Sequence, residues 1–185
     1  MGTEANRLVD SVEEARMALL DGVATLGSSQ SAFKPSPAEW SIEEILEHLY
    51  LAELGGITKI WAALQDARSG RCWTGPLSNR GKPIEEIIAL TWNAKETAPP
   101  VATPHFGGPL VAWVAALRSL RVPLRELAGE LTDAELGQVV FPHFLSGPLD
   151  ARQRLEFLRF HIERHLGQIQ SIRQRPGFPW GARPV

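Results

Sequence analysis

Apolar residues recur every three or four positions over four long stretches of the chain. These stretches run from about residue 4 to 26, from 41 to 66, from 109 to about 127, and from 150 to 174. This spacing places the apolar side chains on one face of an α-helix, so each stretch predicts an amphipathic helix. Few segments alternate with the period of a β-strand. The pattern therefore predicts an all-α fold, a four-helix bundle.

Polar residues at two helix starts support these boundaries. Ser41 is followed three residues later by Glu44, and Asp150 is followed by Gln153 at the same spacing. This is the spacing of a capping box, in which two side chains accept hydrogen bonds from free backbone amides at the start of a helix. We therefore expect the second and fourth helices to begin directly after Ser41 and Asp150.

The third helix contains a proline, and a long connection precedes it. Pro123 removes one backbone hydrogen bond, so we expect a bend near Ser119. The connection from 67 to 108 is rich in Gly, Pro and Trp and contains one short helical pattern, 83–92. A connection this long indicates a crossover, which lets helices two and three run parallel.

Length and composition indicate one ordinary globular domain. The chain has 185 residues, of which 44% are hydrophobic and 22% charged. We assign residues 1–175 to a single bundle domain, followed by an extended C-terminal tail, 176–185, which contains prolines. Cys72 is the sole cysteine, so no internal disulfide can form. We expect its side chain to be inert, with a reactive thiol as the alternative.

Charge and hydropathy exclude several classes of partner. The net charge is −2 and no Lys/Arg run is present, so the chain lacks the positive surface typical of nucleic-acid binding. No apolar run approaches the ~20 residues that span a bilayer. The first residues lack the order of a signal peptide. We expect a cytoplasmic protein without nucleic-acid or membrane partners.

Three histidines form the strongest candidate for chemistry. His161 and His165 are four residues apart in the fourth predicted helix, so their imidazoles lie on one helix face, close enough to bind one metal ion. His48 lies at the edge of the apolar stripe of the second predicted helix. Three neutral imidazoles that leave positions open to water describe a catalytic type of metal site. The alternative is that these histidines are only packed core residues.

The order of these motifs resembles the DinB-like superfamily of helical bundles. The residues that carry the resemblance are Trp40-Ser41, Glu44-Ile45-Leu46, His48-Leu49, Gly147-Pro148-Leu149, His161, His165 and Gln168-Ile169, and it extends from about Leu8 to Ile172. The resemblance implies that His48, His161 and His165 bind a divalent metal, zinc or nickel first, with manganese or iron as alternatives. It also implies a water-completed shell, and it is compatible with a homodimer.

The resemblance implies a small-molecule reaction and leaves its type open. Relatives include thiol-dependent S-transferases and isomerases, and others are called metal-dependent hydrolases. A metal held by three neutral histidines keeps its charge, so it can generate thiolate or hydroxide at neutral pH. We predict a thiol-dependent S-transferase that uses a low-molecular-weight thiol as co-substrate. The alternatives are a metal-dependent hydrolase and a non-catalytic bundle that binds a small molecule.

Several other residues are weaker candidates. His143 precedes Gly147-Pro148-Leu149, a region that in relatives often carries a histidine near the pocket, so the resemblance implies a proton donor or substrate contact. Gln168, one turn beyond His165, could orient a metal ligand or a bound water, or simply pack. His105 in the crossover is a further candidate. Gly55-Gly56 indicates either close helix packing or room for a ligand beside His48.

The sequence argues against a metalloprotease of the H-E-x-x-H type. That motif requires Glu directly after the first histidine, where this chain has Ile162. Glu163 points away from His161 around the helix, so we expect it to be solvated or ion-paired.

Overall fold

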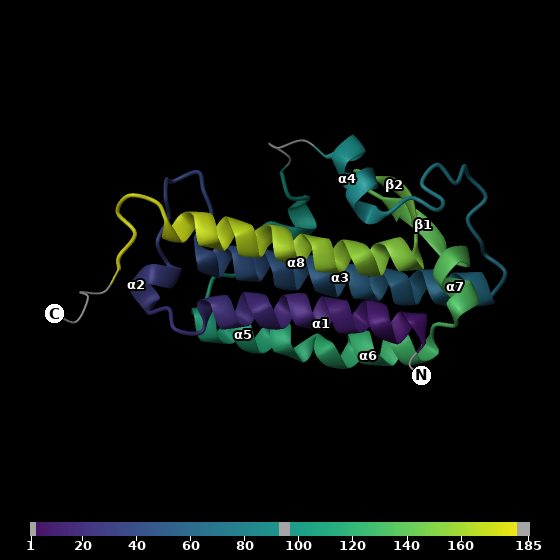
Figure 1. The fold of residues 1–185 in the computed structure, drawn as a ribbon, viewed down its shortest axis with the longest axis horizontal. Helices are drawn as coiled ribbons and strands as arrows, with labels where there is room; N and C mark the ends of the chain where they lie inside the picture. Colours follow the sequence, from purple (N-terminus) through teal and green to yellow (C-terminus); the bar gives the residue numbers. More distant parts are fainter. Residues whose placement is uncertain (1–2, 93–96, 181–185) are drawn as a thin grey trace.

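The computed structural model describes residues 3–92 and 97–180, and Figure 1 shows four long helical segments side by side. They are α1 (Glu4–Val23), α3 (Ile42–Arg68), α5 (Leu110–Ser119) with its continuation α6 (Arg121–Glu130), and α8 (Ala151–Arg173). The predicted all-α four-helix bundle is confirmed. The capping boxes also form as predicted, between Ser41 and Glu44 at the start of α3 and between Asp150 and Gln153 at the start of α8.

The second and third long segments run parallel, as the length of their connection predicted. At one end of the bundle, the backbone N–H of Leu110 donates to Glu43, so both segments begin there. At the other end, Arg68 donates to the carboxylate of Glu130, where both segments end. In Figure 1, α1 and α8 run in the opposite direction. The connection from 69 to 109 therefore returns along the length of the bundle.

The third long segment is interrupted where Pro123 predicts a bend. Helix α5 ends at Ser119 and α6 begins at Arg121, with Leu120 between them at φ −66° and ψ −14°. Because Pro123 has no N–H, the carbonyl of Ser119 lacks its usual partner four residues on. The local loss of this bond explains why the interruption lies there.

The connections contain further short elements. The crossover holds α4 (Ile84–Thr91), which begins after Pro83, and the 3₁₀-helix η1 (Pro100–Ala102). Helix α2 (Ser28–Ser31) precedes α3, and α7 (Asp133–Gln138) follows α6. The predicted helical pattern 83–92 therefore corresponds to α4, whereas η1 carries no helical periodicity in the sequence.

A two-stranded antiparallel hairpin precedes α8, and the sequence did not predict it. Strands β1 (Val140–His143) and β2 (Gly147–Asp150) pair with Pro142 opposite Pro148. Proline usually argues against a strand because it cannot donate to the sheet. Antiparallel strands alternate between hydrogen-bonded and non-bonded pairs, and two facing prolines fit a non-bonded pair. This pairing is visible only once the partner strand is known.

The hydrophobic core lies between the four long segments, and the chain after α8 adds to it. Phe178 is buried and its ring meets that of Phe33 edge to face, with 5.5 Å between centroids. The rest of the expected tail, 181–185, lies outside the described residues. Among the described helices, none has a stretch both long and apolar enough to cross a bilayer.

Candidate metal centre

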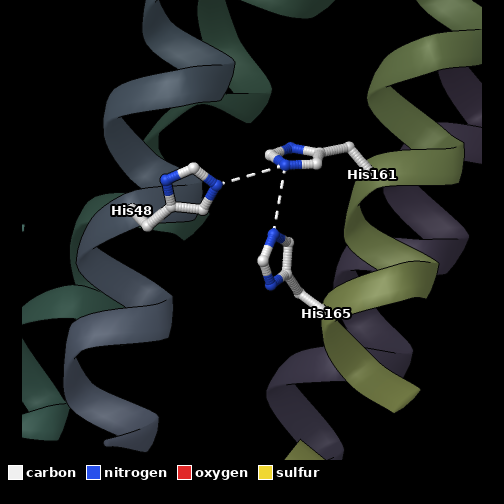
Figure 2. Close-up of side chains that lie close together, drawn as sticks. All are labelled: His48, His161 and His165. Carbon is white, nitrogen blue, oxygen red and sulfur yellow. Dashed lines mark hydrogen bonds between the residues drawn. The ribbon is translucent and has the colours of Figure 1, made fainter. Parts of the chain in front are cut away.

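Three histidines from two helices meet at one point inside the bundle (Figure 2). His48 lies in the second turn of α3, and His161 and His165 lie one turn apart on α8. The Nε2 atom of His161 lies 3.2 Å from Nε2 of His48 and 3.1 Å from Nε2 of His165. The fold therefore brings together the three histidines that the sequence singled out.

The spacing of these nitrogen atoms suits a shared metal ion. Zinc binds imidazole nitrogen at about 2.0–2.1 Å, so two nitrogen ligands in tetrahedral geometry lie about 3.3 Å apart. All three ligand atoms lie within 4.8 Å of one another, and two of the three pairs are close to the expected separation. The three imidazoles thus fit one ion without rearrangement of either helix.

The hydrogen bonds on the far side of two rings fix their tautomers. Nδ1 of His48 lies 2.7 Å from the carbonyl oxygen of Ala102, which can only accept, so Nδ1 donates. Nδ1 of His165 donates in the same way to Oε1 of Gln168 at 2.8 Å. In the neutral rings, both Nε2 atoms then present lone pairs toward Nε2 of His161. An N–H on His161 could donate a hydrogen bond to only one of these two lone pairs, whereas a cation could bind the Nε2 atoms of all three histidines.

Burial keeps the three rings neutral, which is the form that binds metal. His48, His161 and His165 are only 4%, 6% and 5% exposed. Burial lowers the pKa of His48 below its usual range, lowers that of His161 further, and lowers that of His165 to about 3. Neutral imidazoles can therefore bind a metal ion at pH 7 without first losing a proton.

A buried carboxylate next to His48 secures the segment that contacts this ring. Glu47 accepts hydrogen bonds from three successive backbone N–H groups, those of His105, Phe106 and Gly107. Gly107 has φ +68°, a conformation that favours glycine and helps the three N–H groups converge. Glu47 thereby holds the chain that follows η1 against α3, close to the Ala102 carbonyl that accepts from His48.

Aromatic rings lie beside His48 and His161. The Trp40 ring lies 4.9 Å from the ring of His48, and the Phe157 ring is stacked on His161 at 5.6 Å. Trp92 reaches the edge of His161 at 6.4 Å and donates its Nε1–H to the hydroxyl of Ser146. The surroundings are therefore largely apolar, which strengthens electrostatic effects at the centre.

His143 lies in β1, beside the same aromatic group. Its ring is 4.7 Å from Phe157 and stacked at 6.3 Å on Trp92. Nδ1 accepts from the backbone N–H groups of Leu145 and Ser146, so the proton of the neutral ring is on Nε2. Burial lowers the pKa of His143 to about 3. At neutral pH this residue is a hydrogen-bond donor, not the protonated imidazolium of a general acid.

The other candidates lie apart from the cluster or have structural explanations. His105 is exposed, and its ring donates to the carbonyl of Thr103. Cys72 is exposed and follows the C-terminal end of α3, whereas His48 lies near the N-terminal end of this helix. Glu163 pairs with Arg159 at 2.7 Å, as expected for an ion-paired residue.

The two central glycines of α3 have different surroundings. A Cβ atom on Gly56 would lie 2.9 Å from the Leu158 side chain, so this glycine permits close packing with α8. A Cβ atom on Gly55 would meet nothing within 4 Å. The packing explanation therefore holds for Gly56, and open space remains beside Gly55.

Sequence reasoning missed Glu47, Ala102 and Trp92. Glu47 belongs to an acidic first half of a helix, where exposed carboxylates are common. Ala102 contributes only its backbone carbonyl, which has no sequence signature. Trp92 is one of several aromatic residues in or near the crossover, and nothing in the sequence distinguishes it from the others. A buried acidic residue directly before a candidate ligand is the one signal that could have drawn attention to Glu47.

Comparison with known proteins places the chain in a family. The family model of the DinB superfamily matches residues 11–169, most of the chain. The chain belongs to the DinB superfamily. This membership agrees with the resemblance carried by the histidine motifs.

Individual relatives of this DinB-superfamily chain are distant but cover nearly its whole length. YuaE, an uncharacterized protein of Bacillus subtilis strain 168, is 27% identical over 165 residues, covering 88% of this chain and 94% of YuaE. The solved structure of YfiT from Bacillus subtilis, described as a probable metal-dependent hydrolase with an unusual four-helix bundle topology, aligns with TM-score 0.61 and 17% identity, over 95% and 89% of the two chains. A conserved protein from Enterococcus faecalis aligns with TM-score 0.60 and 14% identity, over 94% and 97%. These structures share the fold.

Proposed function

We propose that this protein is a metal-dependent enzyme that binds one divalent ion, zinc or nickel first, through Nε2 of His48, His161 and His165, and acts as a thiol-dependent S-transferase. The observation that carries this proposal is the convergence of three neutral imidazole lone pairs at separations of 3.1 and 3.2 Å. YfiT, a structural neighbour described as a probable metal-dependent hydrolase, supports metal-dependent chemistry in this fold.

The hydrogen-bond partners of the His48 and His165 rings favour thiol chemistry. Among the described residues, the groups that accept from the ligand rings are a backbone carbonyl and a side-chain amide, and none is a carboxylate. The carboxylate nearest in sequence, Glu47, is engaged by three N–H groups. Water-activating sites commonly use a carboxylate as general base. A thiol is more acidic than water and needs no such base once a cation is beside it.

The residues of this site have separable tasks. A divalent ion held by the three histidines supplies the charge that lowers the pKa of a thiol and favours its thiolate. The thiol loses its proton to solvent, the sulfur–carbon bond to the electrophilic substrate forms as the bond to the leaving group breaks, and that group departs with the electron pair. His143 contacts the substrate through its Nε2–H. Trp92 and Phe157 limit access of water.

Elemental analysis and thiol-dependent turnover test this proposal together. We expect close to one metal ion per chain in untagged protein and almost none in the His161→Ala, His165→Ala double variant. We also expect the parent protein to consume 1-chloro-2,4-dinitrobenzene only when a low-molecular-weight thiol is added, with activity lost in the variant. Absence of metal from both proteins, even after reconstitution, would show that the histidines only pack.

A metal-dependent hydrolase is the second candidate, supported by the description of YfiT. Hydrolysis of p-nitrophenyl acetate without added thiol, abolished in the double variant, would favour this alternative. Metal binding without either activity would instead favour a bundle that only binds a small molecule.

A further inference from the structure

Arg154 is a buried arginine whose charge is not neutralised. It lies on α8 and is only 7% exposed. Its NH2 group donates to the backbone carbonyls of Phe141 and Pro142, and its Cζ lies 4.1 Å above the Phe141 ring. Its Nε–H is buried, and none of the described residues accepts a hydrogen bond from it. No carboxylate in residues 3–92 or 97–180 forms an ion pair with it, and burial alone lowers its pKa to about 9.

This arrangement is costly for stability. Burial of an ion without a counter-ion is strongly destabilising, so buried arginines are normally paired. Two carbonyl oxygens compensate only part of this cost. The remaining positive charge and the free Nε–H suit a bound anion, and the planar guanidinium matches a carboxylate in shape.

Arg154 lies on the same face of α8 as the candidate metal centre. It precedes His161 by seven residues, which is two helical turns and about 10.5 Å along the axis. Phe157 lies between them and is stacked on His161. The metal centre and the guanidinium therefore lie at two ends of one strip of α8.

Helix α3 also has a row of residues on one face that begins at His48. In Figure 1, α3 lies beside α8 and runs in the opposite direction. Gly55 follows His48 by two turns, and Lys59 follows Gly55 by one turn, so these residues share one face. Gly55 lies between His48 and Lys59 along α3, and a Cβ atom there would meet none of the described residues within 4 Å. The strips on both helices thus lead from the histidines to a positively charged side chain.

A second donor lies beside Arg154. His143 directly follows Pro142, whose carbonyl Arg154 binds, and the proton of the His143 ring is on Nε2. The positive charges of Arg154 and Lys59 both help to lower the pKa of His143, which agrees with their proximity. This end of the site therefore offers donors from two elements.

We propose that Arg154, with His143, binds the carboxylate of a substrate whose other end reaches the three histidines. The proposal rests on the proposed function for the role of the histidine end. It specifies the substrate class as an elongated carboxylic acid with its reactive group about 10 Å from the carboxylate. Arg154 selects for the charge at the end of the molecule that does not react.

The first experiment measures carboxylate binding to metal-free protein, so it does not depend on the metal. Hexanoate and its neutral counterpart methyl hexanoate are titrated by calorimetry and by tryptophan fluorescence. We expect hexanoate to bind about 10- to 100-fold more tightly than the ester, the effect of a hydrogen bond to a charged group. Arg154→Met should abolish this difference, and Arg154→Lys should retain part of it because the charge remains.

Arg152→Met is the matched control. Arg152 lies on the same helix but pairs with Glu4, so its loss should leave the preference for hexanoate unchanged. Equal affinity of the parent protein for acid and ester, or failure of hexanoate to bind, would overturn the proposal. This comparison needs no variant, so it is decisive even if Arg154→Met fails to fold.

A second experiment separates this proposal from the proposed function. Cobalt-loaded protein is titrated with 6-mercaptohexanoate, 8-mercaptooctanoate and their methyl esters while the absorption of the metal is recorded. Spectral change with the acids and tighter binding than with the esters supports both proposals. If no thiol changes the spectrum but hexanoate still distinguishes the parent from Arg154→Met, the thiol function fails and the carboxylate site stands.

Discussion

Glu47 and His48 are adjacent in α3, but His48 contacts the last residue of η1 whereas Glu47 contacts the segment that follows η1. Nδ1 of His48 donates to the carbonyl of Ala102, and the Glu47 carboxylate accepts from the N–H groups of residues 105–107. A partner that holds the far side of a metal-binding imidazole fixes its orientation and raises its basicity. Glu47 therefore acts on the candidate metal centre through the position of Ala102.

Glu47→Gln should weaken metal binding by about tenfold, the lower end of the effect seen when an outer partner of a ligand is removed. An amide can accept only through its oxygen, so one N–H of the segment would face an NH₂ group. Dissociation constants measured by competition with a chelator check this expectation. Glu43→Gln is the control, because Glu43 accepts from Ser31 and Leu110 outside this turn. Equal weakening in both variants would contradict the assignment.

At the scale of elements, the long helices and the meeting of the three histidines could be predicted, because both depend on which residue types recur at the period of a helix. The histidines stood at the edges of two apolar stripes, and burying those stripes brought the rings together. The hairpin could not be predicted, since Pro142 and Pro148 each argue against a strand unless they face each other. Arg154 looked like one of many surface charges, because its burial depends on β1, which is not apparent in the sequence.

Gly55 and Gly56 provide a test of packing between α3 and α8. Gly56→Ala should lower the free energy of unfolding by roughly 1–3 kcal/mol, because its Cβ would lie 2.9 Å from Leu158. Gly55→Ala should raise it by up to about 1 kcal/mol, because alanine favours the helix and the new Cβ meets nothing within 4 Å. Urea unfolding of both variants measures these changes. If both variants changed the free energy of unfolding in the same direction, the difference in packing between Gly55 and Gly56 would be contradicted.

At the scale of the molecule, the candidate metal centre brings together a residue from the first half of the chain and two residues from its last long helix. His48 and His161 are 113 residues apart in sequence, and their nitrogen atoms are 3.2 Å apart. An unfolded chain cannot hold these atoms at one point, so an ion that needs all three binds the folded state selectively. The binding free energy then adds to the stability of the whole bundle.

Zinc should therefore raise the melting temperature of the metal-free protein, and the rise should depend on its concentration. At a thousandfold excess over the dissociation constant, the stabilisation is about 4.1 kcal/mol. For a chain of this size, that corresponds to a rise of roughly 8–16 °C. Calorimetric melting at several zinc concentrations measures it.

The His161→Ala, His165→Ala variant should show almost none of this rise, because one imidazole cannot hold the ion in place. His105→Ala should show all of it, since that exposed ring lies outside the cluster. An equal rise in all three proteins would mean that zinc binds elsewhere on the chain. A full rise only where His161 and His165 are intact would mean that the ion binds at this histidine cluster, and that its binding stabilises the folded bundle.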